Sequence, residues 1–515
     1  MTRPTRRTFL ASSLTTAAAL PLLPAAVARA AEPEVLDVGD RLELMIDDYL
    51  IDRATAEARL HHPIPQEIAV EHDAPWEGNS SGYHSVFQDG DRYCLYHRGA
   101  RHQRPDEKTP PRIVACYAES DDGIHWRKPD LGLVEFNGSK QNNIILDSGP
   151  RDDIAMPLDA GHQAFFRDEN PDAPAESRYK ALIRGRKGET FALFAFASPD
   201  AIHWKPMQYE PVLSDYGRFD SQNTAFWDPV LGQYRAYCRS GHGGIRSIST
   251  ATSSDYLNWS KLDPLRFPGA DPKEQLYTNA IKPYARAPHL LIGFPTRYIE
   301  RGWSDSMRAL PDLKNREARA KKMLRYGTAL TEGLLMTSRD GRSFHRWDEA
   351  FLRPGPERPG AWYYGHQSIA WHLVQTRSAL DPSIPELSLY APERSWHGPG
   401  TQLRRYTLRL DGFVSRHAPM SGGELLTKPL TFSGNRLTLN FATGAAGAIR
   451  VELQDAAGKP IPGFTLADSN EVFGDAHARQ ATWKQSSDLS HFAGQPVRLR
   501  LELKDADLYA LQFTA

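Results

Sequence analysis

Three acidic residues stand shortly before polar residues that begin strand-like segments. Glu77, Asp220 and Glu274 each precede a His or an Asn by three to seven residues. Hydrolysis of a glycosidic bond uses one carboxylate to protonate the leaving oxygen and a second to activate water or attack carbon. We therefore predict that Glu77, Asp220 and Glu274 are catalytic. The alternative for each acid taken singly is a turn cap or a solvated rim position.

Aromatic, histidine and arginine side chains accompany these acids. Aromatic rings stack on the apolar faces of sugars, and His and Arg donate hydrogen bonds to sugar oxygens. The predicted substrate-binding residues are Trp76, His84, Arg98, His162, Arg239, Tyr277, Tyr364 and His366.

Two repeats indicate which elements position these residues. The first is Ser-x-Asp-x-x-x-aromatic, in which an Asp-containing turn follows a strand and the aromatic residue returns to the core. Its copies are Ser120/Asp122/Trp126, Ser198/Asp200/Trp204, Ser253/Asp255/Trp259 and Ser338/Asp340/Phe344, with a degenerate fifth at Leu410-Asp-Gly-Phe413.

The second repeat is a polar residue that begins an apolar strand, followed by another strand. Its copies start at His84, His162, Asn223, Asn279 and His366. Five units of short antiparallel strands with no helices between them predict an all-β chain with a five-bladed β-propeller. A large β-sandwich is the alternative. We expect Arg41–Ile46 to complete the last blade.

The repeats stop after Arg416, where alternating strand-like segments typical of a sandwich begin. We predict three parts: a signal peptide at 1–30, a propeller catalytic domain at 31–418 and a β-sandwich at 419–515. In the propeller, His84, His162 and His366 could converge near the axis around a metal ion or water. No cofactor fingerprint is present, so we expect no cofactor and leave open a structural divalent cation near the axis.

The first thirty residues have the features of an export signal. Arg6-Arg7 precedes an apolar run and the small-x-small site Ala28-Arg-Ala30. This order predicts twin-arginine export to the periplasm or the outside of the cell. The chain of 515 residues has 62 Lys and Arg against 63 Asp and Glu. This balance argues against nucleic-acid binding, and no later apolar run is long enough to span a membrane.

Three stretches carry a resemblance to a known group of enzymes. They are Ile46-Asp-Asp-Tyr-Leu-Ile51, Ser120-Asp-Asp-Gly-Ile-His-Trp126 and Arg404-Arg-Tyr-Thr-Leu-Arg-Leu-Asp-Gly-Phe413. With the predicted architecture, the chain resembles the five-bladed propeller glycoside hydrolases, the group that holds invertases, levansucrases and arabinanases, and in particular a secreted bacterial branch of it.

The resemblance implies roles for the acids. Glu77, or Asp73, is the base or nucleophile of the first blade, Asp220 stabilises charge, and Glu274 donates the proton, with Glu332 or Glu393 as its alternatives. It also implies a secreted glycoside hydrolase whose partner is a carbohydrate substrate. Two alternatives stay open: a polysaccharide lyase that uses Tyr or His with Arg, and a propeller that binds carbohydrate without catalysis.

Overall fold

The computed structural model describes residues 35–101, 111–214 and 217–515. The predicted signal at 1–30 lies outside these residues. Within them the chain is all-β, as predicted, with short helices at α1 (Asp305–Ala309), α2 (Leu313–Lys322) and α3 (Leu324–Thr328) and 3-10 turns at η1 (Ala175–Ser177) and η2 (Ser490–Phe492). In the described part of the chain, no helix has the length and apolar character needed to cross a membrane.

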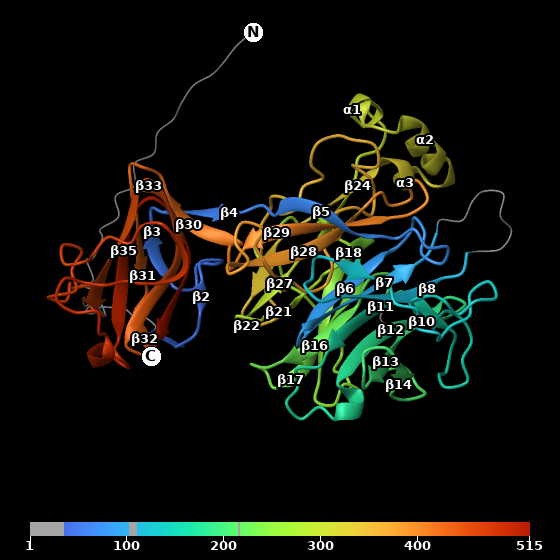
Figure 1. The fold of residues 1–515 in the computed structure, drawn as a ribbon, viewed down its shortest axis with the longest axis horizontal. Coiled ribbons are helices and arrows are strands. Elements are labelled where there is room, and N and C mark those ends of the chain that lie inside the picture. The colour runs from blue at the N-terminus through green and yellow to red at the C-terminus, as the bar shows by residue number, and fades with distance from the viewer. Residues whose placement is uncertain (1–34, 102–110, 215–216) are drawn as a thin grey trace, which may run out of the picture. The chain divides into compact units, whose positions relative to one another are not determined.

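Three consecutive antiparallel sheets follow one another along the chain (Figure 1). The first holds β6 (Gly82–Asp89), β7 (Arg92–Gly99), β8 (Val114–Ser120), β9 (Trp126–Arg127) and β10 (Ile144–Asp147). The second holds β11 (Leu158–Arg167), β12 (Tyr179–Lys187), β13 (Thr190–Ser198), β14 (Lys205–Pro206) and β15 (Leu213–Ser214). The third holds β16 (Thr224–Asp228), β17 (Gln233–His242), β18 (Ile245–Ser253) and β19 (Asp263–Pro264).

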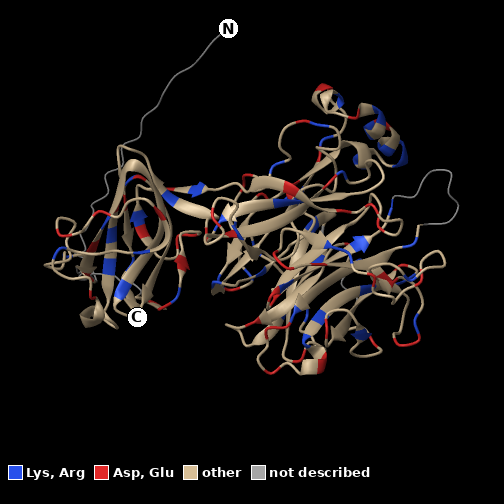
Figure 2. Ribbon diagram, in the orientation of Figure 1, with Lys and Arg blue, Asp and Glu red and all other residues tan. Residues whose placement is uncertain are grey.

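The next strands form two sheets that alternate in sequence. One holds β20 (Gln275–Leu276), β23 (Thr296–Glu300) and β24 (Ala329–Gly333), and the other holds β21 (Lys282–Tyr284), β22 (Ala287–Gly293), β25 (Met336–Ser338) and β26 (His345–Arg346). The three helices are inserted between β23 and β24. Figure 2 shows that Lys and Arg gather on α2, whereas both signs of charge are interspersed elsewhere.

The last sheet of this series joins the two ends of the repeat region. It holds β27 (Val374–Arg377), β28 (Pro385–Glu393), β29 (Gln402–Arg409) and β5 (Ile64–Glu71). The prediction that Arg41–Ile46 would be this closing strand is wrong, because Glu43–Leu44 pair with β35 (Val497–Thr514). Leu42 and Leu44 pack in one hydrophobic cluster and Met45 in another. The alternating pattern of Arg41–Ile46 therefore suits a segment that lies between two hydrophobic cores. The strand that completes the last sheet is β5, which pairs with β29.

The remaining strands form a ten-stranded sheet around β33 (Arg436–Asp455) and β35. Its other members are β1 (Leu36–Gly39), β2 (Glu43–Leu44), β3 (Ile51–Ala54), β4 (Glu57–Leu60), β30 (Val414–Ala418), β31 (Gly423–Thr427), β32 (Leu430–Phe432) and β34 (Asp475–Gln480). Strands from residues 36–60 thus pair with strands from the C-terminal part. The domain boundary at 418/419 stays a prediction.

The Ser-x-Asp motif forms the turn that sequence analysis predicted. Ser120 Oγ accepts a hydrogen bond from the Gly123 amide at 2.9 Å, and Asp122 Oδ1 accepts from the amides of Ile124 and His125 at 2.8 Å. The fourth residue of every copy is left-handed: φ is 73°, 72°, 69° and 73° at Gly123, Ala201, Tyr256 and Gly341. Each turn leads into a two-residue strand that pairs with the strand before the turn, as β9 pairs with β8.

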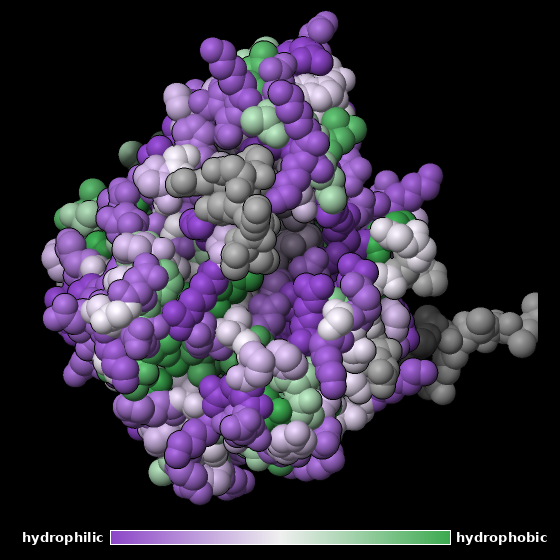
Figure 3. Space-filling view, turned by 90° about the vertical axis from the view of Figure 1, so that its right-hand side faces the viewer, coloured by the Kyte–Doolittle hydropathy of each residue, from purple (hydrophilic) through white to green (hydrophobic). Residues whose placement is uncertain are grey.

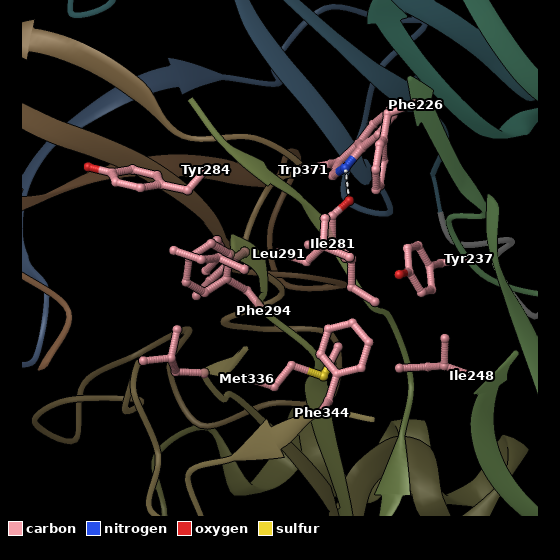
Figure 4. Packing of buried hydrophobic residues seen from close by; sticks show 14 of the residues in the cluster. Phe226, Tyr237, Ile248, Ile281, Tyr284, Leu291, Phe294, Met336, Phe344 and Trp371 are labelled. Atoms are coloured by element: carbon pink, nitrogen blue, oxygen red, sulfur yellow. Dashed lines mark hydrogen bonds between the residues drawn. The ribbon is translucent and has the colours of Figure 1, made fainter. Parts of the chain in front are cut away.

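The largest hydrophobic cluster packs strands of successive sheets together (Figure 4). Trp371, which is fully buried, donates a hydrogen bond from Nε1 to the Ile281 carbonyl at 2.8 Å, and its amide bonds to the His84 carbonyl at 2.8 Å. These contacts link segments that are far apart in sequence. They fix the starts of β6 and β21 relative to each other, and thus the strand ends from which the candidate site is built.

Candidate functional site

One cavity of about 250 Å³ is lined by residues at or next to the ends of strands from several different sheets. Tyr83 lies on β6, Arg98 on β7 and His162 on β11, whereas Asp220 and Tyr277 lie next to β16 and β20. Its wall also includes Ser80, Ser81, Gly82, Thr296, Arg325, Tyr326, Thr331, Tyr364, Gly365, Ser368, Pro392, Ser395 and Trp396. The cavity therefore collects side chains that are up to 316 residues apart in sequence.

His162 lies between two carboxylates. Its Nδ1 is 3.1 Å from Asp159 Oδ2 and its Nε2 is 3.2 Å from Asp220 Oδ1. Because carboxylates accept hydrogen bonds, the imidazole satisfies both only when both ring nitrogens carry hydrogen. Arg184 also donates to Asp159 and lies 3.7 Å from Asp220.

Asp220 supplies the negative charge of the described cavity lining. The hydrogen bond with His162, together with the charges of His162, Arg184 and Arg239, holds the pKa of Asp220 well below its usual range despite partial burial. Its side chain is nevertheless 54% exposed, so a ligand can reach it. Of the described residues that line the cavity, Asp220 alone carries a carboxylate.

Three tyrosines form a hydroxyl-bearing wall. The hydroxyls of Tyr83 and Tyr277 are 3.1 Å apart, and the rings of Tyr277 and Tyr364 meet edge to face at 6.1 Å. Burial raises the pKa of Tyr83 to about 12, and burial also raises the pKa values of Tyr277 and Tyr364. All three hydroxyls are therefore protonated at neutral pH and can donate hydrogen bonds or a proton. Tyr83 reaches this position with a left-handed φ of 53° at a register shift of β6.

Cationic and aromatic groups complete the wall. The Arg98 guanidinium lies 4.8 Å from the centre of the Tyr83 ring and donates to the Ser80 carbonyl at 2.9 Å and 2.7 Å. Trp396 donates from Nε1 to Ser80 Oγ at 3.0 Å, and its ring contacts Tyr326 edge to face at 4.7 Å. Such rings offer surfaces on which a sugar can stack.

Sequence reasoning did not select several of these wall residues. Trp396 lies between β28 and β29, and Arg325 and Tyr326 belong to the inserted α3. The sequence prediction selected residues just before the His or Asn that begins each repeat. None of these three residues stands at such a position. A tryptophan directly after β28 was the available signal, because loops at strand ends commonly carry binding residues.

The predicted proton donor Glu274 does not line this cavity. It pairs with Arg297 at 2.8 Å and with Arg346, beside a separate surface depression. Glu332 pairs with the same Arg297, and the other alternative, Glu393, pairs with Arg358 and Arg404. The reason is local: Glu274 lies in the turn before β20, whereas Tyr277 follows that strand and reaches the cavity.

Other predicted residues also lie outside the lining. Trp76 donates from Nε1 to Asn143 Oδ1 at 2.7 Å, and Arg239 donates to the Asp220 carbonyl at 3.0 Å, with its guanidinium over the Tyr277 ring at 5.0 Å. Buried His366 accepts at Nε2 from the Ser395 amide at 2.9 Å.

The first-blade candidates lie in a different environment. Glu77 and His84 are buried among His72 and His97, and Asp73 is exposed next to Lys128. The structure does not bring His84, His162 and His366 together around an axis, because each has different partners.

Comparisons with known proteins give structural neighbours only. No family model matches the chain, and no curated protein matches it. It is similar to an N-acetylgalactosamine deacetylase from F. plautii, solved with blood group B trisaccharide, at 11% identity over 69% of this chain and 96% of that one, with a TM-score of 0.42.

Two further structural neighbours are a glycosyl hydrolase and an endo-arabinase. A glycosyl hydrolase from Bacteroides ovatus has 12% identity over 70% of this chain and 96% of that one, with a TM-score of 0.40. An endo-arabinase from Bacteroides thetaiotaomicron has 8% identity over 67% and 98%, with a TM-score of 0.39. Glycoside hydrolases are thus among the structural neighbours of the chain, as the sequence resemblance predicted.

Proposed function

We propose that the chain is an exported glycoside hydrolase that cleaves a glycosidic bond of an oligo- or polysaccharide in this cavity. The observation that carries the proposal is the convergence of Asp220, His162, the three tyrosines, Arg98 and Trp396 on one cavity. Sugar recognition uses such a combination, because rings stack on the sugar and polar groups bind its hydroxyls.

The architecture that we propose is a five-bladed propeller followed by a β-sandwich. The sheets of β6–β10, β11–β15 and β16–β19 are three blades, the paired sheets of β20–β26 are a divided fourth, and β27–β29 with β5 are the fifth. The start of each innermost strand then opens toward the cavity, which explains why each of the five blades has a residue in or next to its strands in the wall.

Asp220 is the carboxylate that we assign to the reaction. The glycosidic C–O bond breaks through an oxocarbenium-like transition state, which an adjacent carboxylate stabilises. His162, Arg184 and Arg239 keep Asp220 ionised, and the exposed part of its side chain faces the ligand space. Asp159 and Arg184 hold His162 in place and thereby orient Asp220.

The leaving oxygen requires a proton when the C–O bond breaks, and water that adds to the anomeric carbon loses one. We assign proton donation to the linked hydroxyls of Tyr83 and Tyr277, because Glu77 and Glu274 lie outside the lining. Their raised pKa values keep them protonated in the resting enzyme, and the tyrosinate left after donation accepts the proton that the attacking water loses, which restores the pair.

A polysaccharide lyase is the second candidate. The composition of the cavity wall is also compatible with this function. The cavity combines Arg98 and Arg325 with three tyrosines and a single described carboxylate. In β-elimination, arginine neutralises the carboxylate of a uronate while tyrosine or histidine moves the protons. The same cavity would then select acidic polysaccharides.

One screen separates these functions. The purified chain is incubated with a panel of neutral and acidic polysaccharides, and reducing ends and ultraviolet absorption are measured together. New reducing ends without absorption indicate hydrolysis, and absorption from unsaturated products indicates elimination. Binding with neither signal on any substrate would overturn both proposals in favour of a carbohydrate-binding protein. Asp263→Asn, a half-exposed residue of β19 outside the cavity, is the matched control for Asp220→Asn.

Export is proposed on the sequence pattern alone. Replacing Arg6 and Arg7 by lysine should retain the protein in the cytoplasm, whereas the unaltered chain should be recovered outside it. Fractionation of the producing cells measures the difference. Export of the double variant at the normal level would contradict the proposed route.

A further inference from the structure

A buried group of His72, Glu77 and His97 lies outside the proposed catalytic machinery. We call it the His72 cluster. The three residues are 0%, 1% and 0% exposed. His72 follows β5, Glu77 lies in the connection before β6, and His97 is on β7. The cluster therefore joins the sheet that contains β5 to the sheet that contains β6 and β7.

One ligand atom from each residue points to the same place. Glu77 Oε1 is 3.6 Å from His72 Nδ1 and 3.2 Å from His97 Nε2, and the three atoms lie within 4.8 Å of one another. All three are buried and make no hydrogen bond of acceptable geometry. Buried polar atoms without partners are rare, because each has given up its hydrogen bonds to water on folding.

The outer nitrogens of the two imidazoles have partners that fix their orientation. His97 Nδ1 is 3.2 Å from the Arg98 carbonyl, which only accepts, so this nitrogen carries hydrogen. His72 Nε2 is 3.0 Å from His84 Nε2. In a neutral His97 ring the remaining Nε2 then presents its lone pair to Glu77 Oε1. Metal-binding histidines show this arrangement, with the second nitrogen donating to a carbonyl or another acceptor.

The separations match the edges of a metal coordination sphere. Zinc–nitrogen and zinc–oxygen bonds of roughly 2.0–2.2 Å in a tetrahedron place neighbouring ligand atoms about 3.4 Å apart. The other Glu77 oxygen is occupied, because Lys128 Nζ donates to Oε2 at 2.7 Å. Glu77 is thus set to offer Oε1 as a single oxygen ligand.

We propose that His72 Nδ1, His97 Nε2 and Glu77 Oε1 bind one divalent transition-metal ion. Two imidazoles and a carboxylate favour Zn²⁺ over Ca²⁺ or Mg²⁺, which take oxygen ligands. The ion supplies a partner for all three buried atoms at once. The group does not include His162 or His366, two of the histidines for which the sequence left a cation open.

The proposed ion has a structural consequence. It clips β5 of the last sheet to β7 of the first at the point where the repeat region closes, and it links residues that are 25 positions apart in the unfolded chain. His97 is also followed directly by Arg98, which pairs with Gly82 in register and lines the cavity. Occupancy of the His72 cluster therefore stabilises the cavity wall without contact with substrate.

Elemental analysis of the purified full-length chain tests the proposal. We expect about one zinc ion per chain, or uptake of about one Zn²⁺ or Co²⁺ on titration. The Co²⁺ form should show visible bands of a four- or five-coordinate site. Removal of the ion with a chelator should lower the melting temperature, and added Zn²⁺ should restore it.

Variants connect the ion to these residues. His97→Ala and Glu77→Gln should lose the ion, whereas His372→Gln, which alters a buried histidine with other partners, should keep it. If the two variants fail to fold, the titration of the unaltered chain decides. A chain that contains no metal, takes up neither Zn²⁺ nor Co²⁺ and melts unchanged with chelator would overturn the proposal, as would full metal content in folded Glu77→Gln.

Discussion

The cavity and the His72 cluster both contain histidine and a carboxylate, but these groups differ in burial and in hydrogen-bond partners. In the cavity, both nitrogens of His162 face carboxylates, and Asp220 is 54% exposed. In the cluster, the facing atoms of His72, Glu77 and His97 are buried and lack hydrogen-bond partners. An exposed carboxylate that is held through one oxygen is suited to act on a ligand, whereas a buried set whose facing atoms have no hydrogen bond is suited to hold an ion. Histidine and acid in one sequence therefore do not by themselves identify a catalytic site.

Asp220→Asn should have the largest effect on activity. Loss of the only described carboxylate of the cavity lining should lower kcat by about two to three decades, as loss of a group that stabilises charge in the transition state does. The melting temperature should stay close to that of the unaltered chain, because the side chain is half exposed. Kinetics on the substrate found by the screen measure the loss, with Asp263→Asn as the control. Full activity of Asp220→Asn would remove the cavity from the mechanism.

Tyr277→Phe should lower kcat less, by about tenfold to a hundredfold, since it removes one hydroxyl from the linked pair. The aromatic ring stays, so substrate binding measured as KM should change little. Tyr209→Phe, an exposed tyrosine outside the cavity, is the matched control. A selective rise in KM would show that Tyr277 binds substrate rather than moving a proton.

Glu77→Gln should act on stability. Removing the charge of this buried carboxylate costs about 3 kcal/mol or more, because Lys128 loses the ion-pair partner that it contacts at 2.7 Å. Thermal unfolding measures the decrease, and kcat of the folded fraction should fall far less than in Asp220→Asn. The reverse pattern, with an unchanged melting temperature and lost kcat, would restore Glu77 as the catalytic acid that the sequence predicted.

Acid should destabilise the fold through other buried histidines. Burial holds the pKa values of His366 and His372 well below their ordinary value, with neighbouring Arg319 and Lys282 adding to the effect. The unfolded chain then binds more protons below pH of about 6.5, so the free energy of unfolding falls as the pH decreases through that range. Urea unfolding at several pH values measures the slope, and His372→Gln should make it shallower. A slope unchanged by that substitution would contradict the assignment.

Glu274→Gln should have the smallest effect on turnover. Glu274 pairs with Arg297 and Arg346 outside the cavity, so kcat should fall by less than about tenfold, well short of the loss expected for a general acid. The assay compares substrates with good and poor leaving groups. A large loss confined to poor leaving groups would show that Glu274 does donate the proton and that the cavity changes shape on binding.

Local patterns determined the parts of this protein in which neighbouring residues interact. Each Ser-x-Asp turn is satisfied within the motif, from Ser120 to His125 and in the later copies, so sequence spacing was sufficient to predict it. The strand-like segments that follow His84, His162 and Asn223 became β6, β11 and β16 for the same reason. Position before a strand start also selected Asp220, and position at the end of a strand selected Arg98.

Only the tertiary structure decided which side chains meet. Glu274 and Tyr277 are three residues apart, yet Glu274 pairs with Arg297 on β23 while Tyr277 lines the cavity. Trp396 reaches Ser80 across 316 residues, and His72 meets His97 through the pairing of β5 with the last sheet. Such contacts depend on how strands from distant segments pair and pack, and residue spacing along one segment carries no information about that pairing.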